Sequence, residues 1–207
     1  MLSLFFDTLI ILFVVVDPIG LAPIFAAITH GGTRQYRRRM ALRGTFIAAV
    51  ILFAFVLGGA SLLRVLGIGM PAFQIAGGLL LFLVALDMVF VRQSGIRSTT
   101  EREQREAELK ADVSVFPLAF PLIAGPGALT TVLLMAGKHA QQTAGTVVVL
   151  LVVPVVLLSA LIALLQAEHI MRVMGETGAN VITRLLGVVL AALAVQYALD
   201  GLRAAFN

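Results

Sequence analysis

The chain alternates long apolar runs with shorter polar segments, and this pattern predicts membrane-spanning helices. A span needs about 20 apolar residues, because the hydrocarbon core is about 30 Å thick and a helix rises about 1.5 Å per residue. Open sheets cannot satisfy their backbone groups in lipid, and apolar runs such as 79–84 lack the alternation of a barrel strand. We therefore predict an all-α transmembrane fold of six helices, over residues 4–28, 40–63, 71–91, 113–137, 146–166 and 181–199.

Basic residues lie unevenly between these spans. The segment between the first and second spans carries Arg34, Arg37, Arg38, Arg39 and Arg43. The segment between the third and fourth spans carries four more arginines and a lysine, whereas the opposite side has only Arg64, Lys138 and Arg203. Because basic loops are retained in the cytoplasm, this pattern predicts that both termini lie on the periplasmic or extracellular side.

Composition agrees with a membrane protein. Hydrophobic residues make up 60% of the chain and charged residues 13%, against about 25% charged in soluble domains. The formal net charge of +4 comes from arginines between apolar runs, which indicates cytoplasmic loops and no nucleic-acid partner. The chain has no cysteine and its three histidines form no cluster, so we expect neither a metal site nor a cofactor.

The chain also contains an internal repeat. Residues 64–67 (Arg-Val-Leu-Gly) recur at 172–175 (Arg-Val-Met-Gly), and Pro18 corresponds to Pro126, both with an offset of 108 residues. Three spans per half, an odd number, would make the second half enter the membrane from the opposite side, although short matches in apolar sequence also arise by chance. This organisation gives a first three-helix repeat over 1–91, a polar cytoplasmic linker over 92–112 and a second three-helix repeat over 113–207. Inverted repeats of this kind are typical of secondary transporters, whose sites lie between the halves.

A helix break is predicted in the middle of the first span. Asp17 is a good N-cap, Pro18 is a good first helical residue, and Gly20 and Pro23 weaken a continuous helix. A half-helix that begins inside the membrane could present its free amides to an anionic group such as a substrate carboxylate, while Asp17 could accept an ammonium group or a proton. The alternative is a proline-kinked helix in which Asp17 caps only its own backbone.

A second break is predicted in the fourth span. Gly125 can take the N-cap position and Pro126 the first helical position, without the charge of the first break, and Gly127 follows. Thr130 and Thr131 lie in the next turn, where their hydroxyls could contact substrate or bond to their own backbone carbonyls. We predict that Asp17 and these residues line one mid-membrane cavity.

The sequence resembles the MarC family of bacterial inner-membrane proteins. The resemblance covers essentially the whole chain and depends on residues 17–20 (Asp-Pro-Ile-Gly), the proline- and glycine-rich segment 117–127, and Gly201-Leu202 after Asp200. It implies a place in the bacterial inner membrane and a relation to LysE-type amino-acid exporters, with some relatives described as neutral amino-acid transporters. The family name refers to multiple antibiotic resistance, a role that is doubtful for its members.

These features together predict a secondary transporter of small neutral amino acids or similar solutes. Its partners would be the lipid bilayer and the solute, and a homo-oligomer is compatible with the sequence. Asp17 and Asp87 are candidates for ion or proton coupling, although Asp87, near the end of the third span, can also be a rim residue. A structural or assembly protein without a solute path is the rival interpretation. An intramembrane enzyme is disfavoured because the spans contain neither paired carboxylates nor a His–Ser arrangement.

Overall fold

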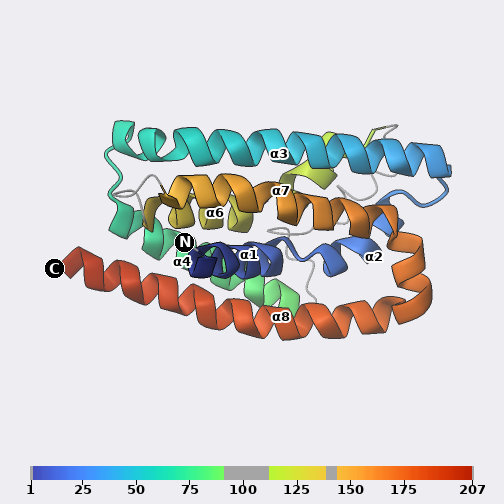
Figure 1. Cartoon of the computed structure of the whole chain (residues 1–207). Coiled ribbons are helices and arrows are strands. Elements are labelled where there is room, and N and C mark those ends of the chain that lie inside the picture. The colour runs from blue at the N-terminus through green and yellow to red at the C-terminus, as the bar shows by residue number, and fades with distance from the viewer. Residues whose placement is uncertain (1, 91–111, 139–143, 207) are drawn as a thin grey trace.

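A computed structural model describes residues 2–90, 112–138 and 144–206, and this part of the chain is built from helices, with no strand (Figure 1). Five helices are long and apolar enough to cross a membrane, and a pair bent by 53° adds a sixth candidate span. The prediction of an all-helical membrane protein is therefore confirmed, and the predicted six spans are reached when the bent pair counts as one span. In chain order the helices are α1 (Leu2–Val16), α2 (Pro18–Ile28), α3 (Arg34–Val65), α4 (Met70–Phe90), η1 (Ser114–Ile123), α6 (Pro126–Lys138), α7 (Ala144–Leu165) and α8 (Ala167–Phe206).

Two of the helices are longer than the predicted spans. α3 begins six residues before the predicted 40–63 window, because Thr33 caps it by accepting a hydrogen bond from the Tyr36 amide at 3.2 Å. The helix ends in a Schellman motif, in which Gly67 has φ +69° and Ile68 donates to the Leu63 carbonyl at 2.9 Å. α8 begins well before the predicted 181–199 window and is kinked at Gly175, where φ is +65°. Polar turns can thus extend a helix beyond its apolar span.

The helices form layers around the two bent segments. α3 packs against α7 on one side of α1 and α2, with α6 beside α7, while α4 and α8 pack along one another on the other side (Figure 1). α3 also contacts η1 and α6, whereas α7 contacts α1 and α2. The residues at the two breaks, such as Asp17 and Ala124, are buried inside the bundle, whereas parts of α1 and η1 reach its surface.

Close contact between α4 and α8 depends on glycines. A Cβ atom added to Gly78 of α4 would lie 2.7 Å from the Ala194 carbonyl oxygen, and one added to Gly201 of α8 would lie 2.9 Å from the Pro71 carbonyl oxygen. Small residues let helix backbones approach in a membrane, where there is no hydrophobic driving force between helices. Large apolar side chains such as Phe46 and Leu185 are 69% and 65% exposed, as expected for surfaces that face lipid.

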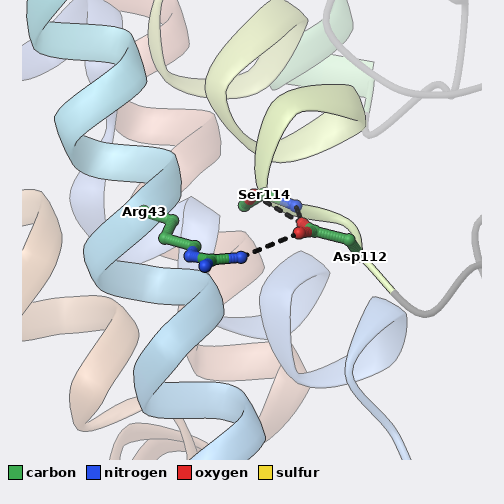
Figure 2. Close-up of polar contacts among 3 residues, drawn as sticks. All are labelled: Arg43, Asp112 and Ser114. Atoms are coloured by element: carbon green, nitrogen blue, oxygen red, sulfur yellow. Dashed lines mark hydrogen bonds and ion pairs between the residues drawn. The ribbon is translucent and has the colours of Figure 1, made fainter.

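The predicted linker lies almost wholly outside the described residues, since only Asp112 of 92–112 belongs to them. Asp112 fastens the start of η1 to α3 (Figure 2). One carboxylate oxygen accepts hydrogen bonds from the amide and hydroxyl of Ser114 at 2.9 and 2.5 Å, and the other is 3.3 Å from the Arg43 guanidinium. The hydrogen bonds from Ser114, and to a lesser degree Arg43, hold the pKa of Asp112 below its usual value.

Candidate functional site at two helix breaks

The first span breaks at Asp17. α1 ends at Val16 and α2 begins at Pro18, and Asp17 between them has left-handed backbone angles of φ 49° and ψ 68°. Aspartate adopts this conformation more readily than most residues because its short side chain bonds to nearby backbone. Pro18 suits the first helical position because the amide that it lacks would have no partner inside the helix.

The carboxylate of Asp17 is buried, with 1% of the residue exposed. Its Oδ1 accepts a hydrogen bond from the Gly20 amide at 3.0 Å, and its Oδ2 accepts one from the Thr183 hydroxyl of α8, also at 3.0 Å. A buried carboxylate persists in a membrane protein only when polar groups surround it. Asp17 therefore joins the start of α2 to a helix from the other end of the chain.

Gly20 makes this arrangement possible. A Cβ atom at this position would collide with Asp17 Oδ2 and lie 2.7 Å from Thr183 Oγ1. The absence of a side chain lets the carboxylate fold back over the first turn of α2. Pro23, inside α2 and half-buried, removes one further intrahelical hydrogen bond.

The second break has no charged residue. η1 is a wide, irregular helical turn with non-helical backbone angles at Phe116 and Phe120, and α6 begins at Pro126 after a bend of 53°. The Phe116–Pro117 and Phe120–Pro121 peptide bonds are both cis. Gly125 is buried at the turn between η1 and α6. This position requires glycine, because an added Cβ atom would collide with the carbonyl oxygen of Pro121.

The two breaks approach one another. A Cβ atom added to Gly127, in the first turn of α6, would lie 3.3 Å from Cγ1 of Val15, in the last turn of α1. A cavity of about 10 Å³ lies here, about the space that one water molecule needs. It is lined by Val15, Val84 of α4 and residues of the segment 121–128, including Gly125, Pro126 and Gly127. Asp17, Thr130 and Thr131 do not line this cavity, so a cavity shared by all of them stays a prediction.

The two predicted threonines are buried on α6, at 4% and 0% exposure. The Thr130 methyl group faces Gly77 of α4, where an added Cβ atom would collide with it. The Thr131 hydroxyl has no hydrogen-bond partner within the described part of the chain. A buried hydroxyl without a partner costs about 1–3 kcal/mol, so Thr131 is a candidate for contact with a water or solute.

Two further residues differ in how well the sequence indicated their role: Asp87 was a predicted candidate, and Thr183 was not. Asp87 is half-buried near the end of α4 and lines neither the cavity at the breaks nor the larger cleft described below. Thr183 was not predicted, because its partner Asp17 is 166 residues away and no local pattern marks the pair. The only signal was a hydroxyl among the apolar residues of the sixth span.

A cleft of about 940 Å³ is lined by residues from the end of α2, the start of α3 and the junction of α7 and α8. These elements meet at the end of the bundle that Figure 1 draws on the right. Phe25, Ala26 and Thr29 line it from α2 and its C-cap. The half-helix α2 therefore begins at the first break and ends at this cleft.

Comparison with known proteins identifies the family. A 208-residue alignment with a UPF0056 membrane protein of Archaeoglobus fulgidus is 38% identical and covers 97% of this chain and 93% of the relative. UPF0056 membrane protein YvbG of Bacillus subtilis is 34% identical over 100% of this chain and 97% of its own length. UPF0056 inner membrane protein YhgN of Escherichia coli K12 is 31% identical, with coverage of 94% and 93%. No solved structure matches the chain. The model of the MarC family of integral membrane proteins matches residues 2–206, and the chain belongs to this family.

Proposed function

We propose that this protein is a secondary transporter of small neutral amino acids or similar solutes in the bacterial inner membrane. The observation that carries the proposal is the meeting of two helix breaks in the interior of the bundle, between Val15 and Gly127. Broken helices expose backbone donors and acceptors at membrane depth, where they persist only in protein or beside a water-filled path. Transporters use such breaks to bind solutes and ions.

The arrangement of the helices supports two inverted repeats. At the shared offset of 108 residues, Pro18 and Pro126 each begin a half-helix, and Gly67 and Gly175 each have a positive φ, of 69° and 65°. The packing is also reciprocal: α3 packs on η1 and α6 of the second half, and α7 packs on α1 and α2 of the first half. α4 contacts α6, as α8 contacts α2. In each half, helices therefore pack against the broken span of the other half, an arrangement compatible with alternating access.

Asp17 is the group that we assign to charge recognition. It is a buried acid at the N-terminus of a half-helix that starts inside the bundle, so an ammonium group or a proton could bind its carboxylate. Gly20 and Thr183 orient the carboxylate. Since Asp17 already binds the Gly20 amide, the first-turn amides of α6 at the second break are the candidates for a carboxylate of the solute. A zwitterionic amino acid would then place one charge at each break.

α2 links the proposed site to solvent. Its first residue follows Asp17, and its last turns line the cleft at the arginine-rich end, which the positive-inside rule assigns to the cytoplasm. With about 10 Å³ between the breaks and about 940 Å³ in the cleft, we propose that the structure represents a state closed at the site and hollow towards the cytoplasm. The name of the E. coli relative, an inner membrane protein, supports the proposed location.

Uptake and efflux of labelled amino acids in proteoliposomes, with and without a proton gradient, test the proposal. We expect Asp17→Asn to reduce transport by at least about tenfold, since it keeps the size and a capping oxygen but removes the charge. Asp7→Asn is the matched control, because Asp7 is an exposed acid on α1. If no amino acid is transported, a structural or assembly role without a solute path replaces the proposal. If Asp17→Asn transports as well as Asp7→Asn, the protein is a transporter but Asp17 is not its charge-recognition group.

A further inference from the structure

The cleft at the arginine-rich end is a separate feature from the helix breaks. It lies between α2 and the start of α3 on one side and the junction of α7 and α8 on the other (Figure 1). Its volume of about 940 Å³ is at the upper end of the range for small-molecule sites, which is about 300–1,000 Å³. The helix breaks contribute none of its lining residues.

The charge of this cleft is strongly positive. Arg34, Arg37, Arg38 and Arg172 line it, against a single acidic residue, Glu168. Glu168 forms an ion pair with Arg37 across the cleft, with Oε1 2.5 Å from the guanidinium. Arg34, Arg38 and Arg172 have no ion pair with any acidic side chain that the structure describes. Of the four guanidinium groups that line the cleft, three thus have no acidic partner among the described residues.

The rest of the lining is mixed: Thr29, Gln35, Gln166 and His169 are polar, and Phe25, Leu164 and Leu165 form an apolar part. Phe25 and Leu164 are each 2% exposed, so their side chains form a floor, and Leu165 beside them is 49% exposed. A ligand in the cleft would place an anionic group among the arginines and could lay an uncharged part against this floor. The first turns of α3 and α8 both line the cleft, and the positive ends of their dipoles add to the attraction for an anion.

We propose that this cleft binds a phosphate-type oxyanion, carried either by a soluble phosphorylated compound or by the headgroup of an anionic lipid. Guanidinium groups bind phosphate oxygens through two parallel hydrogen bonds, and several of them around one hollow favour a multiply charged group over a neutral solute. Basic pockets between membrane helices bind lipid phosphates in this way. The inference depends on the cleft alone and holds whether or not the protein transports amino acids.

A comparison of Arg38 with Arg39 distinguishes phosphate binding from a role of the arginines in membrane orientation alone. Basic residues near the membrane surface set orientation by their number, so Arg38 and Arg39 should then be equivalent. Arg39 is an exposed neighbour of Arg38 on α3, but it does not line the cleft. Binding in the cleft therefore requires Arg38 and is indifferent to Arg39.

Substitution of Glu168 should change phosphate binding in the direction opposite to substitution of the arginines. Its carboxylate neutralises Arg37 and repels an incoming anion. Glu168→Gln removes the negative charge and frees Arg37, so it should strengthen phosphate binding. If the ion pair had only a structural role, its loss would bring no gain in phosphate binding.

The test measures the melting temperature of the purified full chain in nanodiscs. In one arm, inorganic phosphate is titrated into phosphatidylcholine nanodiscs; in the other, phosphatidylcholine is replaced by a mixture with phosphatidylglycerol. We expect stabilisation in at least one arm, an apparent affinity about fivefold weaker in Arg38→Gln and in Arg172→Gln, unchanged in Arg39→Gln, and stronger in Glu168→Gln. An effect in the phosphate arm identifies a soluble ligand, and an effect in the lipid arm alone identifies a headgroup.

The proposal is overturned if neither arm stabilises the protein, or if Arg39→Gln weakens binding as much as Arg38→Gln. Should an arginine variant fail to fold, Glu168→Gln still decides, because unchanged or weaker binding in that variant contradicts an anion site in this cleft.

Discussion

The two helix breaks expose backbone groups in the same region of the bundle but satisfy them with different chemistry. At the first break a buried carboxylate, Asp17, accepts hydrogen bonds from Gly20 and from Thr183 of α8. At the second break the segment 114–128 contains no charged residue, and the chain turns because Gly125 passes close to the Pro121 carbonyl group. The Asp17 carboxylate thus links the first break to α8 of the other half, whereas the second break depends only on the close packing of its backbone.

This difference indicates how the work of a transporter would be divided between the breaks. In the proposed transporter, an ammonium group or a coupling proton would bind at the first break, and the second break would supply a close-fitting apolar wall with Gly127 against Val15. Changes at the first break should therefore act through hydrogen bonds and charge, and changes at the second through volume. The following predictions test this comparison.

The largest effect on stability is expected from Gly20→Ala. The added methyl group collides with the Asp17 carboxylate and crowds Thr183, so we expect the free energy of unfolding to fall by about 3 kcal/mol. Gly58→Ala is the matched control: it is an exposed helical glycine whose added Cβ would meet no atom within 4 Å, and a small gain is expected from helix propensity. Denaturant unfolding in mixed micelles measures both. Equal stabilities would show that Asp17 does not fold back over Gly20.

Thr183→Val should have the next largest effect. The change keeps the shape of the side chain but removes the donor to Asp17 Oδ2, and we expect a loss of about 1–2 kcal/mol in the same unfolding assay. Thr177→Val, at an exposed position on the same helix, should change stability by less than about 0.5 kcal/mol. A loss no greater than that of the control would mean that the link between α8 and the first break contributes nothing.

The smallest effect concerns Asp112 at the start of η1. Its folded-state pKa lies below the ordinary value of an aspartate, so its contribution to stability is present above that ordinary pKa and is lost as the pH falls through the folded pKa. The Asp112 side chain is 47% exposed, which limits the contribution to less than about 1 kcal/mol. Lowering the pH from about 5 to about 3 should therefore destabilise the wild type slightly more than Ser114→Ala, which lacks the hydroxyl that contributes most to the shift.

Ser159→Ala is the control for Asp112, because the Ser159 hydroxyl donates to the Val156 carbonyl and not to a carboxylate. Its pH dependence should match that of the wild type. Identical acid sensitivity in all three proteins would exclude a role for Asp112 in anchoring η1.

The spans were predictable from the sequence because the thickness of the bilayer sets the length of an apolar run. The starts of α3 and α8 were not, because polar turns, rich in arginine only in α3, continue a helix without a hydrophobic signal. Proline and glycine indicated where regular helix would be difficult, but they did not indicate the wide turns of η1, since a missing amide does not determine which remaining bonds form.

The contacts that complete the candidate site were beyond sequence reasoning for a different reason. Thr183 and Asp17 are 166 residues apart, and Arg43 and Asp112 are 69 residues apart, so each pair depends on tertiary packing. The arginines between spans were predicted to set orientation, but that four of them line one hollow with Glu168 follows only from the positions of α3 and α8.

Cross-linking across the two breaks tests the central claim most directly. The chain has no cysteine, so Val15→Cys combined with Gly127→Cys introduces a single pair at the point where the breaks meet, and Val15→Cys with Gly58→Cys provides a control pair. Amino-acid uptake by proteoliposomes is measured before oxidation, after oxidation and after reduction. We expect the first pair alone to form a disulfide, to lose uptake when oxidised and to regain it when reduced. Failure of the disulfide to form, or full uptake by the cross-linked protein, would contradict a transport site at the two breaks.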